Sequence, residues 1–109
     1  MEKVKIDEFG IFKYILAEVS DDQNIWTVVR GGLKYDLHKK IFSSLLREVY
    51  PSQIKCLGGG QIAVFPEQKK MLVGGFSSAF GAADHEAVIK IIKKSPIYSD
   101  YSIIIDNRL

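Results

Sequence analysis

Residues 74–85 read Gly-Gly-Phe-Ser-Ser-Ala-Phe-Gly-Ala-Ala-Asp-His and join two segments of different periodicity. A strand-like run at residues 70–75 precedes this stretch, and a helical pattern at residues 83–94 follows it. Loops of small residues leave backbone N–H groups unpaired, and a helix N-terminus adds further free N–H groups and partial positive charge. The stretch therefore predicts a strand–loop–helix unit whose loop binds an anion such as phosphate or sulfate, through the N–H groups of Ser77, Ser78 and Ala79.

The composition is that of one folded domain covering residues 1–109, with 47% hydrophobic and 26% charged residues. The net charge of +2 is too small to indicate nucleic-acid or membrane binding. The single cysteine excludes an intrachain disulfide and favours a reducing compartment. No apolar run has the length of a bilayer span, and the first residues lack a signal-peptide core. We therefore expect a cytoplasmic monomer without a nucleic-acid or membrane partner.

The rest of the chain mixes strand and helix patterns. Strands are expected at residues 3–6 (at an edge), 11–19, 25–30, 53–65 with a glycine interruption, 70–76 and 101–105. The last of these is apolar throughout, which favours a central, fully buried strand. A helix is expected from an N-cap at Asp36 to about Tyr50, and a second over residues 83–94. This order predicts an α+β fold, with a mixed sheet of about six strands and two helices.

His38 stands in the first turn of the first expected helix, beside the apolar stripe Leu37, Ile41, Leu45 and Val49. With two histidines, one cysteine and no metal-binding spacing, the chain offers no dedicated zinc site, so no metal or cofactor is expected. Spacing alone is equally compatible with a half-buried structural histidine.

Two cations occupy strand positions. Lys13 interrupts an apolar row, and Arg30 ends a strand. Taken alone, Lys13 is typical of an edge-strand lysine that reaches solvent, and Arg30 of a solvated charge. Together with His38 they match the needs of phosphoryl transfer, namely N–H donors, positive charge and a nucleophile or base. A helix N-terminus and nearby cations favour the neutral imidazole that this role requires.

Several motifs, in the same order along residues 10–102, resemble the protein phosphohistidine phosphatase family, which includes the insect sex-regulated janus and ocnus proteins. They are Gly10-Ile11-Phe12-Lys13-Tyr14-Ile15-Leu16, Val29-Arg30-Gly31, His38 at its helix start, Cys56-Leu57-Gly58-Gly59-Gly60, and Phe76-Ser77-Ser78-Ala79-Phe80-Gly81 through His85.

The resemblance implies metal-independent removal of phosphate from phosphohistidine, or from phospholysine, in protein substrates. It also implies a small fold with a mixed sheet of about six strands and two helices. His38 falls on the catalytic histidine, Lys13 on a substrate-contacting lysine, and Arg30 on an arginine near the site. The phosphate-binding loop corresponds to Ser77, Ser78 and Ala79, and supporting positions to Gly58, Gly59, Gly60, Gln61 and His85.

The chain departs from the family pattern at Gln61, where an arginine often follows the three glycines. Ser78, Phe80 and Ala82 also differ from the common residues of the loop. Because Gln61 removes one cation, a second hypothesis is a janus/ocnus-type regulatory module that binds phosphate or a phosphoprotein with little turnover. Phosphate release from a phosphohistidine peptide, without added metal, separates the two hypotheses.

Overall fold

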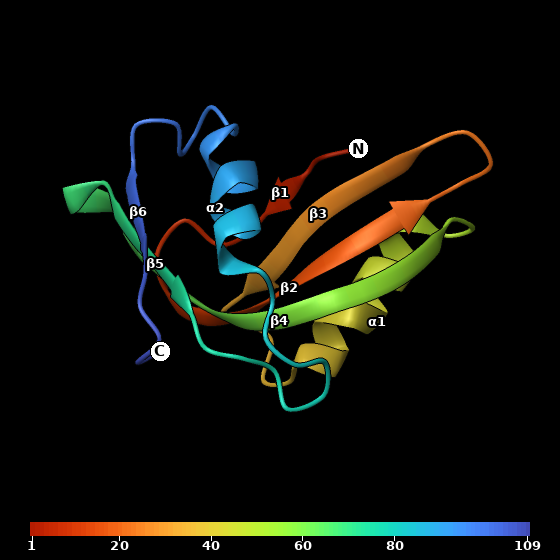
Figure 1. Cartoon of the computed structure of the whole chain (residues 1–109), viewed down its shortest axis with the longest axis horizontal. Helices are drawn as coiled ribbons and strands as arrows, with labels where there is room; N and C mark the ends of the chain where they lie inside the picture. The colour runs from red at the N-terminus through yellow and green to blue at the C-terminus, as the bar shows by residue number, and fades with distance from the viewer.

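A six-stranded mixed sheet carries one helix on each face (Figure 1). The structure is a computed structural model that describes all 109 residues. Its strands are β1 (Val4–Lys5), β2 (Gly10–Ser20), β3 (Ile25–Gly32), β4 (Gln53–Phe65), β5 (Lys70–Gly74) and β6 (Ser102–Ile105). The helices are α1 (His38–Val49) and α2 (His85–Lys93), and a 3₁₀ turn, η1 (Pro66–Gln68), joins β4 to β5. The expected α+β fold is confirmed. Neither helix has the length and hydropathy needed to span a membrane.

The strands lie in the order β1-β3-β2-β4-β5-β6. β1 pairs parallel with β3 and β6 parallel with β5, while the other three pairs are antiparallel. β1 is an edge strand, as predicted. β6 is also an edge strand, so its predicted central position is wrong; Ile104 is 48% exposed. An apolar run cannot distinguish a fully buried strand from an edge strand covered on one face.

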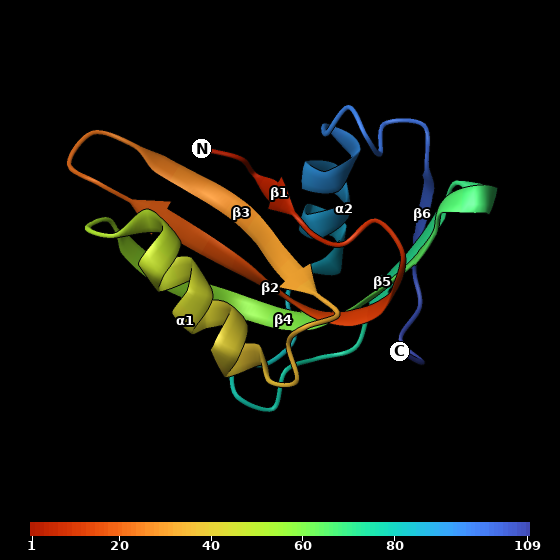
Figure 2. The ribbon, with the colours of Figure 1, turned by 180° about the vertical axis from the view of Figure 1, so that it is seen from behind.

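Alternate residues of β2 serve two cores, one on each face of the sheet. Phe12, Tyr14 and Leu16 pack on the side of α2, and Ile15 and Ala17 pack on the side of α1. Figure 2 shows α1 lying across β2, β3 and β4, with α2 behind the sheet. Because β2 runs between β3 and β4, the edge-strand interpretation of Lys13 is wrong.

The two helices begin differently. Leu37 is the N-cap of α1 and supplies no side-chain bond, so the predicted cap at Asp36 is wrong. Asp36 instead pairs with Lys40 at 2.9 Å. Leu37 is 53% exposed and lies outside the buried stripe. In α2, by contrast, the carboxylate of Asp84 accepts a bond from the N–H of Ala87 at 3.1 Å, as a capping residue does.

The predicted glycine interruption of β4 is a bulge within one continuous strand. Gly58 lies opposite Leu16 and Cys56 opposite Ala17, so Leu57 is the extra residue. β4 and β5 form the expected antiparallel hairpin.

Candidate functional site

A pocket of about 330 Å³ at the N-terminus of α1 brings together residues that are distant in the sequence. Its lining consists of Lys13, Leu37, His38, Lys39, Ser77, Ser78 and Ala79. Both ribbon views show the loop between β5 and α2 passing beside the start of α1 (Figures 1 and 2). The helix whose N-terminus faces the Ser77–Ser78–Ala79 turn is therefore α1, and not α2 as the sequence suggested.

His38 is buried, with 7% of its surface exposed, and its ring is fixed by one hydrogen bond. Its Nε2 lies 2.9 Å from the carbonyl oxygen of Gly60. A carbonyl only accepts, so Nε2 carries the hydrogen and, in the neutral ring, Nδ1 carries the lone pair. No buried side-chain nitrogen or oxygen lacks a partner, yet Nδ1 of His38 makes no hydrogen bond. Nδ1 consequently keeps some solvent-accessible surface, which a nucleophile or base requires.

The glycines of β4 allow the loop and His38 to approach the sheet. The N–H of Gly59 donates to Gly81 at 3.0 Å, and the N–H of Ala83 donates to Gly59 at 3.0 Å. A Cβ atom at Gly59 would lie 2.8 Å from Cδ2 of His38 and 3.1 Å from Cβ of Ser77. Only a glycine leaves room for both side chains at this position.

The turn after β5 offers fewer free donors than the sequence suggested. The N–H of Ser77 donates to Gly81 at 3.0 Å, and Oγ of Ser77 accepts from the N–H of Ala79 at 3.2 Å. Ser78 alone among the three predicted donors has an N–H without a partner in the chain. The expectation of three free donors is wrong because the Gly81 carbonyl takes the N–H of Ser77 and the Ser77 hydroxyl takes the N–H of Ala79, two residues on.

The first turn of α1 supplies the missing donors. The first N–H of this helix to find a carbonyl is that of Lys40, which donates to Leu37 at 3.1 Å. The N–H groups of His38 and Lys39 are therefore free at the positive end of the helix dipole. The side chains of Lys13, half-buried, and Lys39, exposed, add positive charge to the same pocket. Sequence reasoning missed Lys39, although its place next to His38 at a helix start was a usable signal.

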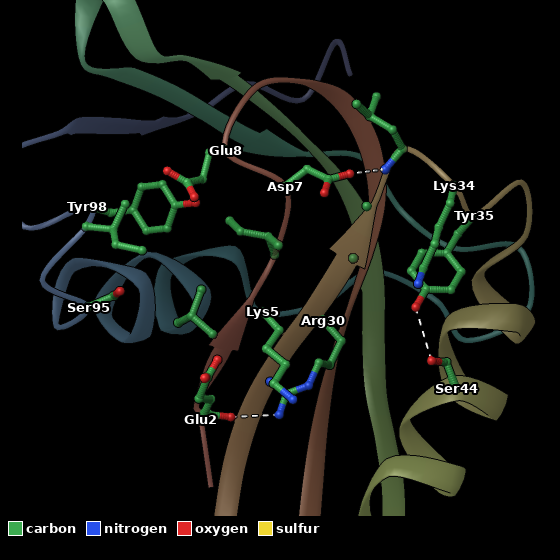
Figure 3. A pocket seen from close by; sticks show the side chains of 16 residues that line it. Glu2, Lys5, Asp7, Glu8, Arg30, Lys34, Tyr35, Ser44, Ser95 and Tyr98 are labelled. Carbon is green, nitrogen blue, oxygen red and sulfur yellow. Dashed lines mark hydrogen bonds between the residues drawn. The ribbon is translucent and has the colours of Figure 1, made fainter.

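Arg30 lies elsewhere. Its guanidinium is buried and donates from Nε and Nη2 to the two carboxylate oxygens of Glu48, at 3.0 and 2.9 Å. Nη2 also donates to the carbonyl of Glu2 at 2.7 Å, a bond drawn in Figure 3. That figure shows the largest cavity, about 690 Å³, which Arg30 lines and His38 does not. The predicted role of Arg30 at the phosphate site is therefore wrong; the residue anchors the N-terminal segment and α1. The guanidinium, in turn, lowers the pKa of Glu48.

His85 has both ring nitrogens engaged. Nε2 donates to the carbonyl of Gly75 at 2.8 Å, so Nδ1 accepts from the hydroxyl of Tyr14 at 2.6 Å. Burial raises the pKa of Tyr14, which keeps its hydroxyl a donor. His85 thus ties β2 to the start of the loop, a placement compatible with the expected supporting role. Tyr14 was missed, and its only signal was a hydroxyl within an apolar row.

Gln61 is the direct neighbour of Lys13 across the β2–β4 ladder. Gln61 is neutral and does not line the pocket, so Lys13 and Lys39 are the cations of its lining. No cluster of three or more histidine, cysteine or acidic side chains is arranged to hold a metal ion.

Comparison with known proteins identifies the family. The family model described as Janus/Ocnus matches residues 1–102. The chain is 39% identical over 109 positions to sex-regulated protein janus-B of Drosophila orena, covering 96% of this chain and 77% of that protein. It is 36% identical over 108 positions to sex-regulated protein janus-A of Drosophila melanogaster, covering 95% and 78%. Given these matches and the fold and site described above, the chain belongs to the Janus/Ocnus family.

Proposed function

We propose that this chain is a protein histidine phosphatase that hydrolyses phosphohistidine without a metal, with His38 acting as nucleophile or general base. The observation that supports this most is the open Nδ1 of a buried histidine whose other nitrogen is bonded to Gly60. His38 lines a pocket that also holds two lysines and the free N–H groups of a helix N-terminus.

The phosphoryl group would be held by three backbone donors, the N–H groups of Ser78, His38 and Lys39. The ammonium groups of Lys13 and Lys39 would balance its charge. Donors fixed before the reaction stabilise the charge on the equatorial oxygens without reorganising, which is the main need of phosphoryl transfer.

The chemistry can follow two routes. In the first, the lone pair of Nδ1 of His38 bonds to phosphorus as the bond from phosphorus to the substrate nitrogen breaks. The departing nitrogen keeps that electron pair, and water later attacks the phosphorylated His38, loses a proton to solvent and releases phosphate. In the second, Nδ1 takes a proton from water while the water oxygen bonds to phosphorus and the same P–N bond breaks.

The composition of the pocket favours an N-phosphorylated substrate over a phosphate ester. No aspartate or glutamate lines the pocket, so no carboxylic acid is available to protonate an alkoxide leaving group. Phosphohistidine protonated on its second ring nitrogen leaves as neutral imidazole and needs no such acid.

The test is phosphate release from a phosphohistidine peptide in the presence of a metal chelator. His38→Ala should lower turnover by about 10²- to 10⁴-fold, the usual contribution of a positioned acid–base group, while Trp26 fluorescence reports an intact fold. Lys13→Ala should raise KM, whereas Lys90→Ala, an exposed lysine of α2 away from the pocket, serves as the matched control. Turnover that survives in His38→Ala would remove His38 from the mechanism. Labelled phosphate trapped on His38 after rapid quenching would select the first route.

A binding module without turnover is the second candidate, and two observations favour it. Gln61 is neutral beside Lys13, and Arg30 is held by Glu48 away from the pocket. Tight binding of the phosphohistidine peptide by the wild-type chain, with no phosphate released, would support the module over the enzyme.

A further inference from the structure

The two helices leave part of one sheet face bare. α1 packs against β2, β3 and β4, whereas α2 packs against β3, β5 and β6 on the opposite face. Figure 2, which views the sheet from the side of α1, shows no helix in front of β5 and β6. Side chains of these strands that face this side therefore lack a covering helix.

Four apolar residues stand in register across this bare face. Ile11 of β2 lies opposite Ala63 of β4, Ala63 opposite Leu72 of β5, and Leu72 opposite Ile104 of β6. Leu72 alternates with residues of the core beneath α2, which places it on the bare side. We call these four residues the apolar ladder. Its two ends, Ile11 and Ile104, are 56% and 48% exposed, while Leu72 is half-buried and Ala63 between them is buried at 1%.

The apolar ladder is continuous with the pocket of His38. Lys13 is two residues from Ile11 on the same face of β2, about 7 Å away at the usual rise of a strand, and it lines the pocket. Leu37, which is 53% exposed, also lines the pocket. A protein whose modified side chain enters this pocket therefore also contacts the surface around Lys13, which borders Ile11 at the first end of the ladder.

We propose that the apolar ladder is the docking surface for the substrate protein, which presents apolar side chains next to its phosphorylated histidine. This proposal rests on the proposed function. The positive charge of Lys13 and Lys39 attracts the anionic phosphoryl group, and the apolar ladder packs against the apolar side chains that flank the modified histidine of the substrate. A single phosphorylated amino acid would fill the pocket without reaching the ladder, so the ladder discriminates among proteins and not among phosphoryl groups.

The experiment compares two phosphohistidine peptides, one with leucines and one with serines on either side of the modified residue. The wild-type chain should favour the leucine peptide about tenfold in kcat/KM, as expected for covering two partly exposed isoleucines. Ile11→Thr combined with Ile104→Thr, which keeps β-branched residues in both strands, should bring this ratio to about one. Release of phosphate from free phosphohistidine should be unchanged. Ile25→Thr, at a 69% exposed strand position away from the ladder, should keep the full preference.

Equal use of the two peptides by the wild-type chain, or an undiminished preference in the double variant, would overturn the proposal. A wild-type chain that sediments as a dimer, and a double variant that sediments as a monomer, would assign the ladder to a second copy instead. If no peptide is hydrolysed, the proposed function fails, and peptides carrying a stable phosphonate in place of phosphohistidine still test the docking surface. Tighter binding of the leucine version, lost in the double variant, would then support docking; equal binding would refute it.

Discussion

Gly59 is the residue on which the candidate site depends most directly, and Gly59→Ala tests this. The added Cβ would lie 2.8 Å from Cδ2 of His38 and 2.8 Å from the carbonyl oxygen of Tyr14, whereas ordinary contact begins at 3.4 Å. It would also lie 3.1 Å from Cβ of Ser77. Because Gly59 has no positive φ, the cost is one of space and not of backbone strain. The carbonyl belongs to the β2–β4 ladder and is the less mobile neighbour, so His38 and Ser77 must move.

We expect two separable effects. Overpacking should lower the free energy of unfolding by about 1–3 kcal/mol, measured by urea denaturation with Trp26 fluorescence. Displacing the imidazole should lower phosphate release, by up to about 10²-fold if the shift reaches about 1 Å. The ring signals of His38 in NMR spectra should shift as well, which reports the displacement independently of any activity.

Gly81→Ala is the matched control. An added Cβ at Gly81 meets no atom within 4 Å, but φ is +79°, so the substitution strains the backbone by about 1–2 kcal/mol without filling the site. It should lower stability to a similar degree and leave the signals of His38 nearly unchanged. Unchanged His38 signals and full phosphate release in Gly59→Ala would refute the idea that this glycine sets the contact between His38 and the loop.

Three further substitutions test the structure. Glu48→Gln should lower stability by about 1–3 kcal/mol at neutral pH, since it weakens the bond to a buried guanidinium. The folded pKa of Glu48 lies below its ordinary value of 4.5. The stabilisation that the Glu48 carboxylate gives the folded state is therefore fully present above pH 4.5 and is lost as the pH falls through the folded pKa. In urea titrations at acid pH, Glu48→Gln should accordingly lose stability less steeply than the wild-type chain. Asp84→Ala should cost about 1 kcal/mol in thermal unfolding, and Asp36→Ala less than about 0.5 kcal/mol, because only Asp84 caps a helix. Tyr14→Phe should cost about 1–3 kcal/mol and leave Nδ1 of His85 without its donor, and a double-mutant cycle with His85→Phe should show coupling between the two residues.

The strands and helices followed from local patterns, with errors where tertiary context decides. Periodicity correctly placed Ile41, Leu45 and Val49 in the core beneath α1. The same reasoning put β6 at the centre of the sheet, because three consecutive isoleucines look alike in a buried strand and in an edge strand. Asp36 was a sound capping candidate, but it pairs with Lys40 two residues before the helix starts.

In the candidate site too, local sequence identified residue types, whereas tertiary packing decided which of them meet. The types of residue near His38 were identified from the sequence, and Lys13, Ser77, Ser78 and Ala79 do meet it in one pocket. Arg30 does not, because the strand end that carries it faces Glu48. No pattern in the sequence could indicate that partner, since the two residues belong to separate elements whose packing brings them together.

What the sequence by itself determined is the set of elements and the residues able to carry phosphoryl chemistry, because propensity, periodicity and residue type act over a few neighbouring positions. What only the tertiary structure decided is which of these residues meet. The crossing of β4 beneath α1 sets the Gly60 carbonyl against His38, and Gly59 bonds the loop at Gly81 and Ala83, which brings the loop to the start of α1. The contacts of His38 with Gly60 and of Gly59 with the loop join residues 22 or more positions apart along the chain, and such contacts depend on strand order and packing, which local sequence does not encode.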